Sequence, residues 1–230
     1  MANLKNGQNL NSELREKVHS EMTERYKLIK ELFERHPTLQ EILEKRTYIA
    51  GGAIRSSILD EKINDVDVFF YDQESLEYFL EAVTVEGFSL PKKWRMKKTI
   101  NSLSFHYENS IYPTIQFIKL HTGMPSKMIE EFDFTCNMNF FIPSSHYLHV
   151  EDIEAIETRL LYVNISNCSV VNTFYRIFKF MEQGWGINGE SLANMTILLS
   201  GLDEIESHDE VRDYLLMGMS QVEFNFGGKK

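Results

Sequence analysis

The chain has 230 residues, of which 43% are hydrophobic and 25% charged, and its formal net charge is −10. With 16 Phe and 10 Tyr this composition excludes an intrinsically disordered chain, and the acidic balance argues against a protein that coats nucleic acid non-specifically, although a local basic patch stays compatible with it. No apolar run approaches the ~20 residues of a membrane span, the polar N-terminus is unlike a signal peptide, and two cysteines without a CxxC pair favour a reducing, cytoplasmic setting.

The first part of the chain is predicted to be helical after a start rich in Asn and Gly. A helix capped by Asn11 or Ser12 is expected, because apolar residues follow at helical spacing. These residues are Val18, Met22, Tyr26, Ile29, Leu32 and Phe33. Pro37 is expected to end this helix, and a short second helix is expected over residues 38–45.

The middle of the chain is predicted to supply the strands of a sheet. The expected strands cover residues 47–50, 65–71, 99–108, 114–120 and 133–142. The helices expected between them cover residues 53–59, 73–83 and 126–131. Beyond about residue 150 the pattern becomes helical, with expected helices at 172–182, 190–200 and 209–219. We therefore predict an α+β domain in residues 1–150 and a helical C-terminal subdomain in residues 151–230.

Two short motifs carry the chemistry. Gly51 and Gly52 follow the first expected strand, and the second opens with Asp65 and Asp67. Carboxylates two apart on a strand share one face, and a divalent cation such as Mg²⁺ relieves their repulsion. Two such ions stabilise the attacking and leaving oxygens of a phosphoryl displacement, and glycines let the backbone approach a phosphate. Each motif alone is common, so the hypothesis of phosphoryl transfer depends on their order.

A basic segment lies between two expected elements and has two interpretations. Its five cations in seven residues are Lys92, Lys93, Arg95, Lys97 and Lys98. One interpretation is a phosphate-binding patch near the active site, for a nucleoside triphosphate or an RNA backbone. The other is a solvated loop between a helix and a strand. Both stay open, although so dense a patch is unexpected in an acidic chain.

The order of the motifs resembles the polymerase-β-type nucleotidyltransferase superfamily, in which a Gly-Gly or Gly-Ser turn precedes a DxD or DxE strand. GGAIR, residues 51–55, is similar to the GGxVR opening of bacterial CCA-adding enzymes and poly(A) polymerases. DFTCNM, residues 133–138, resembles their DFTxNA strand, and NTFYR, residues 172–176, stands where their EDxxR helix selects the incoming base. The resemblance covers about residues 47–185. It implies a nucleotidyltransferase fold, with a mixed sheet flanked by helices.

The resemblance also implies roles for individual residues. Asp65 and Asp67 would hold Mg²⁺ or Mn²⁺ and act in catalysis. Asp133 is a candidate for the third catalytic carboxylate that the superfamily often carries on a later strand. The expected nucleotide-binding residues are Gly51, Gly52, Arg55, Asn137 and Arg176, and Lys98 from the basic segment.

The chain departs from that family at several positions. Glu131 and Phe132 replace two arginines that precede the DFT motif. Gln116 stands on the strand where a third carboxylate is expected. Asn172 and Thr173 replace the acidic pair of EDxxR, so selection of CTP and ATP as in CCA addition is not expected.

Two functions are consistent with these residues. The first is Mg²⁺-dependent transfer of a nucleoside monophosphate from an NTP to a hydroxyl, with release of pyrophosphate. The expected acceptor is an RNA 3′ end such as that of tRNA, bound through the basic segment, while a protein or a small molecule stays open. Stand-alone proteins of this type, among them toxin-like tRNA modifiers and proteins of tailed phages, are similar in size and layout. The second is a catalytically impaired member that binds a nucleotide or a partner.

Overall fold

The computed structural model describes residues 10–85 and 88–200 of the chain. The strands are β1 (Thr47–Ala50), β2 (Asp65–Phe70), β3 (Trp94–Lys98), β4 (Ser102–Tyr107), β5 (Thr114–Thr122), β6 (Asn139–Ile142), β7 (Tyr147–Val150), β8 (Leu160–Leu161) and β9 (Gly186–Ile187). The helices are α1 (Ser12–Leu32), α2 (Pro37–Arg46), α3 (Gly52–Ile58), α4 (Gln73–Thr84), α5 (Pro125–Met128), α6 (Ile153–Glu157), α7 (Val170–Glu182) and α8 (Gly189–Ser200). Short 3₁₀ turns are η1 (Glu108–Ser110), η2 (Ile129–Glu131) and η3 (Thr135–Asn137).

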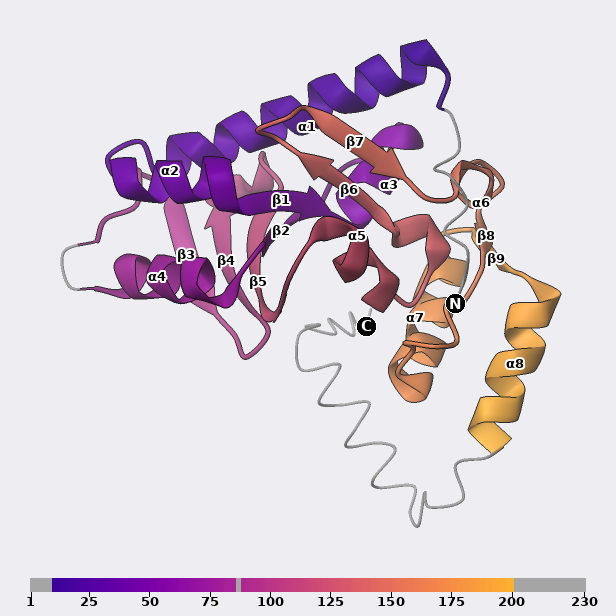
Figure 1. The fold of residues 1–230 in the computed structure, drawn as a ribbon. Coiled ribbons are helices and arrows are strands. Elements are labelled where there is room, and N and C mark those ends of the chain that lie inside the picture. Colours follow the sequence, from indigo (N-terminus) through magenta and orange to yellow (C-terminus); the bar gives the residue numbers. More distant parts are fainter. Residues whose placement is uncertain (1–9, 86–87, 201–230) are drawn as a thin grey trace, which may run out of the picture.

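The main sheet has the strand order β3-β4-β5-β2-β1-β6-β7, and β8 pairs with β9 in a separate small sheet (Figure 1). β2 and β5 are parallel and the other neighbours of the main sheet are antiparallel, so the sheet is mixed. β2 lies at the centre, where Asp67 is opposite Ala50 of β1 and Gln116 of β5. The predicted α+β fold with a mixed sheet flanked by helices is confirmed.

The two faces of the sheet differ in what covers them. Val66, Val68 and Phe70 of β2 enter the large core that the sheet forms with α1 to α4. In this core Phe33, the C-cap of α1, makes edge-to-face ring contacts, including one with Phe117 of β5 at 5.9 Å between ring centroids. Such a contact contributes about 0.5–1.5 kcal/mol beyond burial. Since side chains alternate along a strand, Asp65 and Asp67 point to the other face.

The N-terminal helix begins and packs as the sequence predicts. The side chain of Asn11 accepts a hydrogen bond from the Leu14 backbone N–H at 2.8 Å, which satisfies a free donor of the first turn. Residues at helical spacing, including Val18 and Met22, are fully buried. α1 packs against α3, and it thereby supports the helix that starts at the Gly-Gly turn (Figure 1).

Several elements differ from the prediction. The strand expected over 133–142 forms only at Asn139–Ile142, because the preceding residues make the η3 turn, in which Asn137 N donates to Phe134 O. β3, β7, β8 and β9 were not predicted. The helix expected at 126–131 is α5 followed by η2. The helix expected at 209–219 lies outside the described residues. Among the helices described, none is long and apolar enough to cross a membrane.

Candidate nucleotide-binding cleft

A glycine turn joins β1 to α3 next to the paired carboxylates. Gly51 has φ +89° and ψ −140°, a backbone conformation that only glycine adopts without strain. Its N–H donates to the carbonyl of Asn139 on β6 at 2.9 Å, which closes the turn against the sheet. A Cβ at Gly51 would lie 3.6 Å from the Phe132 ring and 3.9 Å from Asp67 Oδ2. The turn therefore brings backbone directly beside the carboxylate.

Asp65 and Asp67 stand together at the start of β2. Asp65 is exposed and Asp67 half-buried. Burial, and then the charge of Asp65, raise the pKa of Asp67 to about 7. In the described part of the chain no hydrogen bond or ion pair engages either carboxylate. Two carboxylates that repel each other and that no described side chain engages fit a divalent cation.

The size of the acidic group limits which metal site it can form. Within residues 10–85 and 88–200, no cluster of three or more His, Cys, Asp and Glu side chains could hold a metal ion. Mg²⁺ usually takes one or two protein carboxylates and completes its shell with water and substrate phosphates. Asp65 and Asp67 thus suit a cation that arrives with a phosphate ligand. They do not suit a cation held by protein alone.

The raised pKa predicts an effect on stability. Asp67 titrates near its ordinary pKa of 3.8 when unfolded and at about 7 when folded. Its contribution to stability is therefore present below pH 4 and is lost as the pH rises through 7. In EDTA, Asp67→Asn is expected to raise the free energy of unfolding by about 1–2 kcal/mol at pH 8 and by less at pH 5. Thermal unfolding at both pH values measures this difference, and an equal effect at both would contradict it.

A cleft of about 580 Å³ opens beside the two carboxylates. Its walls are α3, the loop between α3 and β2, the start of β2, and one face of α7. The lining residues are Gly52, Ala53, Arg55, Ser56, Glu61, Lys62, Asn64, Asp65, Asp67, Asn137, Arg176, Lys179, Phe180 and Gln183. Arg176, Lys179 and Phe180 come from α7, and Gln183 is its C-cap. Because positions 176, 179/180 and 183 recur every three or four residues, these side chains occupy one side of that helix. Four cations and three carboxylates in one cleft are complementary to a polyanion carrying metal ions.

Arg55 joins the Gly-Gly turn to the rest of the cleft. Its Nη1 donates to Asn137 Oδ1 at 2.7 Å, and its guanidinium lies over the rings of Phe180 at 4.8 Å and Trp185 at 5.5 Å. Burial lowers the pKa of Arg55, but an arginine stays protonated in proteins. Its Nε is buried without a partner. Arg55 therefore braces α3 against α7 and holds Asn137 in the wall of the cleft.

Asp133 lies apart from the carboxylate pair. Its Oδ2 forms an ion pair with Arg176 Nη1 at 2.7 Å, its Oδ1 is buried without a partner, and it does not line the cleft. Burial raises the pKa of Asp133, and the positive charge of Arg176 opposes that shift. The structure therefore does not bring Asp133 to the position of a third carboxylate. Its ion pair with Arg176 ties α7 to the segment between η2 and η3 instead.

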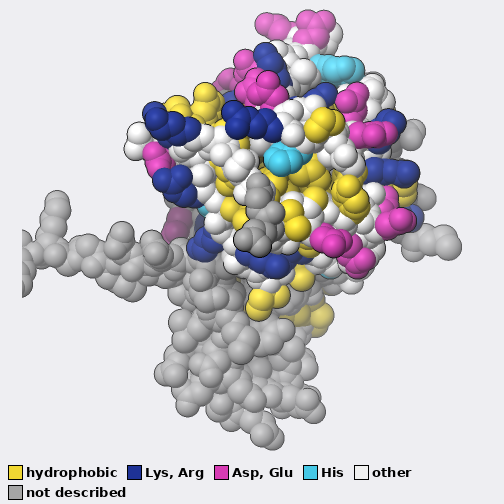
Figure 2. Space-filling model, turned by 90° about the vertical axis from the view of Figure 1, so that its left-hand side faces the viewer, with side chains coloured by type: hydrophobic (Ala, Val, Ile, Leu, Met, Phe, Trp, Pro, Cys, Tyr) yellow, Lys and Arg dark blue, Asp and Glu magenta, His cyan; other side chains and the backbone are white. Residues whose placement is uncertain are grey.

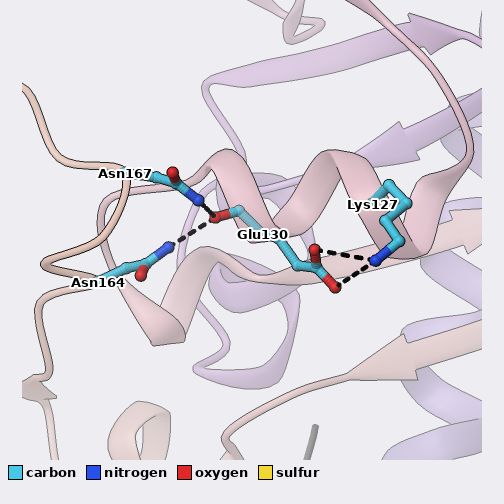
Figure 3. A network of polar contacts seen from close by, with 4 residues as sticks. All are labelled: Lys127, Glu130, Asn164 and Asn167. Carbon is cyan, nitrogen blue, oxygen red and sulfur yellow. Dashed lines mark hydrogen bonds and ion pairs between the residues drawn. The ribbon is translucent and has the colours of Figure 1, made fainter. Parts of the chain in front are cut away.

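The segment that leads to Asp133 is held by an asparagine pair (Figure 3). The side-chain amides of Asn164 and Asn167 donate to the carbonyl of Glu130 at 2.6 Å and 2.7 Å. Asn164 also donates to the carbonyl of Phe132 at 3.0 Å. These bonds place Phe132 beside Gly51, at a position where the resembling family has arginine.

The remaining predicted residues divide between the two faces of the sheet. Gln116 neighbours Asp67 in register, so an amide stands where a third carboxylate was expected. Lys98 pairs with Leu103, whose side chain is buried in the core beneath the helices. By strand alternation Lys98 points away from the carboxylates, and it does not line the cleft. The structure does not place it for nucleotide binding.

The basic segment is partly an edge strand, which corrects the interpretation as a loop. Lys92 and Lys93 precede β3, which contains Arg95, Lys97 and Lys98. Charged side chains on an edge strand also hinder pairing with another sheet. Figure 2 views the molecule from the side on which β3 and α4 lie in Figure 1. Lysine and arginine side chains are interspersed there with acidic and hydrophobic ones.

Some cleft residues were not identified from the sequence. Lys179 and Gln183 follow Arg176 at helical spacing, so a helical wheel from Arg176 would have found them. Lys62 and Asn64 belong to the loop before Asp65, and no local pattern distinguishes them from surface residues. Gly51, Gly52, Arg55, Asn137 and Arg176 lie in or beside the cleft as predicted. Their roles stay predictions.

The strand order, the Gly-Gly turn and the paired carboxylates define a protein of the nucleotidyltransferase fold class. Solved CCA-adding enzymes share this fold: a complex with CTP has a TM-score of 0.56 and 15% identity, covering 88% of this chain and 54% of that one. A Thermotoga maritima CCA-adding enzyme with tRNA has a TM-score of 0.55 and 15% identity, covering 93% and 54%. A complex with ATP has a TM-score of 0.55 and 16% identity, covering 91% and 49%. The chain thus spans about half the length of these structures.

The family follows from the sequence match. Residues 19–159 match Gad2, the Gabija anti-defense 2 family protein, and the chain belongs to this family. The match includes the Gly-Gly turn, both carboxylates of β2 and the Asp133 segment. No curated protein matches the chain.

Proposed function

We propose that this protein is a Mg²⁺-dependent nucleotidyltransferase that moves a nucleoside monophosphate from an NTP to a hydroxyl. One observation carries the proposal. Asp65 and Asp67, engaged by no other described residue, stand at the wall of a cleft that also holds four cations. A surface pair of acids with no function would be expected to find cationic partners or to stay apart.

The residues of the cleft would have separate roles in the reaction. Asp65 and Asp67 would hold the metal, which when bound stabilises negative charge on the phosphate oxygens. The glycine turn admits the triphosphate next to Asp67, and Arg55 fixes that turn. The acceptor oxygen bonds to the α-phosphorus, the bond from that phosphorus to the bridging oxygen breaks, and pyrophosphate leaves. The hydroxyl proton passes to water, since Gln116 cannot accept it.

The acceptor we propose is an RNA 3′ end such as that of tRNA. One of the solved structures with this fold is a complex with tRNA, and Lys97 lies in the same cross-strand row as Ser104, Gln116 and Asp67. That row gives a polyanion a route from the basic edge of the sheet to the carboxylates. Because the family is named for Gabija anti-defense, we place this transfer in that role.

A labelling experiment tests the proposal. The full chain is incubated with Mg²⁺ and each α-labelled NTP, separately with total RNA and with total protein from a bacterial host. Labelled RNA of discrete size, dependent on Mg²⁺, is the expected result. Labelled protein would keep the transferase and replace the acceptor. No labelled product in either fraction, with all four NTPs, would contradict transfer to RNA and to protein.

A second candidate is a nucleotide-binding module that does not turn over. Gln116 opposite Asp67 favours it, because among the described residues no third carboxylate joins the pair in a group that could hold a metal ion. Calorimetry with NTP and Mg²⁺ separates the two functions. Tight binding without pyrophosphate release over long incubation would select the module.

A further inference from the structure

Two lysines of the cleft have no partner in the described chain. Arg176 pairs with Asp133, and Glu61 pairs with Arg159 at 2.6 Å. Arg55 is enclosed by Asn137 and two rings. Lys62 and Lys179 are exposed and, among residues 10–85 and 88–200, form no ion pair or hydrogen bond. They are the cleft cations left free for a ligand.

Their positions suit an anion held between two walls. Lys62 lies in the loop before β2, three residues ahead of Asp65, and Lys179 lies on α7, one turn after Arg176. Both line the cleft that contains Asp65 and Asp67, and they come from two different elements of its wall. A ligand that reaches the carboxylates therefore shares the cleft with both lysines.

Glu131 and Phe132 leave no cation at the two positions directly before Asp133. Phe132 contacts Phe69 at 5.9 Å between ring centroids and occupies the space beside Gly51. Any positive charge for a triphosphate must therefore come from other elements. The loop before β2 and α7 are where this chain carries it.

We propose that Lys62 and Lys179 bind the β- and γ-phosphates of the incoming nucleoside triphosphate, a role that rests on the function proposed above. Each ammonium donates to phosphate oxygens while the α-phosphate lies next to Asp65 and Asp67. Their contribution therefore grows with the number of phosphates. It is absent for a nucleoside monophosphate, and it does not depend on the base.

Calorimetry on the full chain tests this assignment without turnover. The probes are α,β-methylene triphosphates of the four nucleosides, the matching monophosphates, and a short RNA without a terminal triphosphate, all with Mg²⁺. Lys62→Ala and Lys179→Ala are each expected to weaken triphosphate binding about tenfold, the effect of one charge-assisted contact. Monophosphate and RNA binding should stay within about twofold, and Lys179→Arg should restore most of the affinity.

The controls distinguish a failure of this inference from a failure of the proposed nucleotidyltransferase function. Lys27→Ala, at an exposed position of α1 outside the cleft, should leave triphosphate binding unchanged, and all variants should melt like the wild type because the replaced lysines are exposed. Equal triphosphate affinity in wild type and Lys62→Ala/Lys179→Ala overturns the inference and leaves the transferase standing. A loss confined to the RNA probe also overturns it and assigns the lysines to an acceptor backbone. A wild type that binds none of the four triphosphates contradicts both proposals.

Discussion

Replacing Asp65 and Asp67 together by asparagine is expected to lower nucleotidyl transfer at least about 10³-fold. Asparagine keeps the shape of each side chain but removes both negative charges, so the cation that neutralises the reacting phosphates is lost. A loss of about 4 kcal/mol of transition-state stabilisation corresponds to this factor. Initial rates of pyrophosphate release, with saturating NTP and Mg²⁺, measure it.

A matched variant controls for the loss of charge alone. Asp60→Asn makes the same chemical change five residues before Asp65, at an exposed site that pairs with Lys17 and does not line the cleft. Asparagine also tolerates the positive φ of +57° at this position. Its rate should stay within about twofold of wild type. A double variant that retained more than a tenth of the wild-type rate would refute the metal role of the pair.

Replacing Arg176 by alanine is expected to destabilise the fold by about 2 kcal/mol at pH 8. The change leaves the buried carboxylate of Asp133 without its ion partner, and Oδ1 of that carboxylate already has none. Burial holds the pKa of Asp133 above its usual value, and loss of Arg176 raises it further. Stability that such a group contributes falls as the pH rises. The cost should therefore be smaller at pH 5 than at pH 8.

The partner residue provides the control for this prediction. Asp133→Asn removes the buried charge and leaves Arg176 half-exposed to solvent, so it should cost less than Arg176→Ala. Chemical denaturation of both single variants and the double variant gives the coupling between the two residues. If the double variant is no more stable than Arg176→Ala at pH 8, the buried charge is not the cause of the loss.

The centre of the site could be predicted because its geometry is local. The turn that follows β1 requires a positive φ at Gly51. Asp65 and Asp67 share one face of their strand independently of the rest of the chain. α1 was predicted with its N-terminal cap because the capping residue and the apolar spacing lie in one segment. Such features need no knowledge of distant contacts.

Other parts of the site depend on contacts between distant segments. Asp133 matches a motif in sequence, but Arg176 on α7 engages it away from the carboxylate pair. β3 is exposed at four of its five positions, three of them charged, so its sequence lacks the alternation that marks a strand. The strand forms through pairing with β4. Lys62 lines the same cleft as residues of α7, which lies far from it in the sequence. These features follow from tertiary packing.

The fate of the two ends of the triphosphate tests the central claim most directly. Parallel reactions contain ATP, or the NTP that binds best, labelled at either the α- or the γ-phosphorus, with Mg²⁺ and total RNA. A nucleotidyltransferase places the α-label on RNA and releases the γ-label as pyrophosphate, and Asp65→Asn/Asp67→Asn does neither. Transfer of the γ-label to RNA, or equal labelling by wild type and the double variant, would contradict the account.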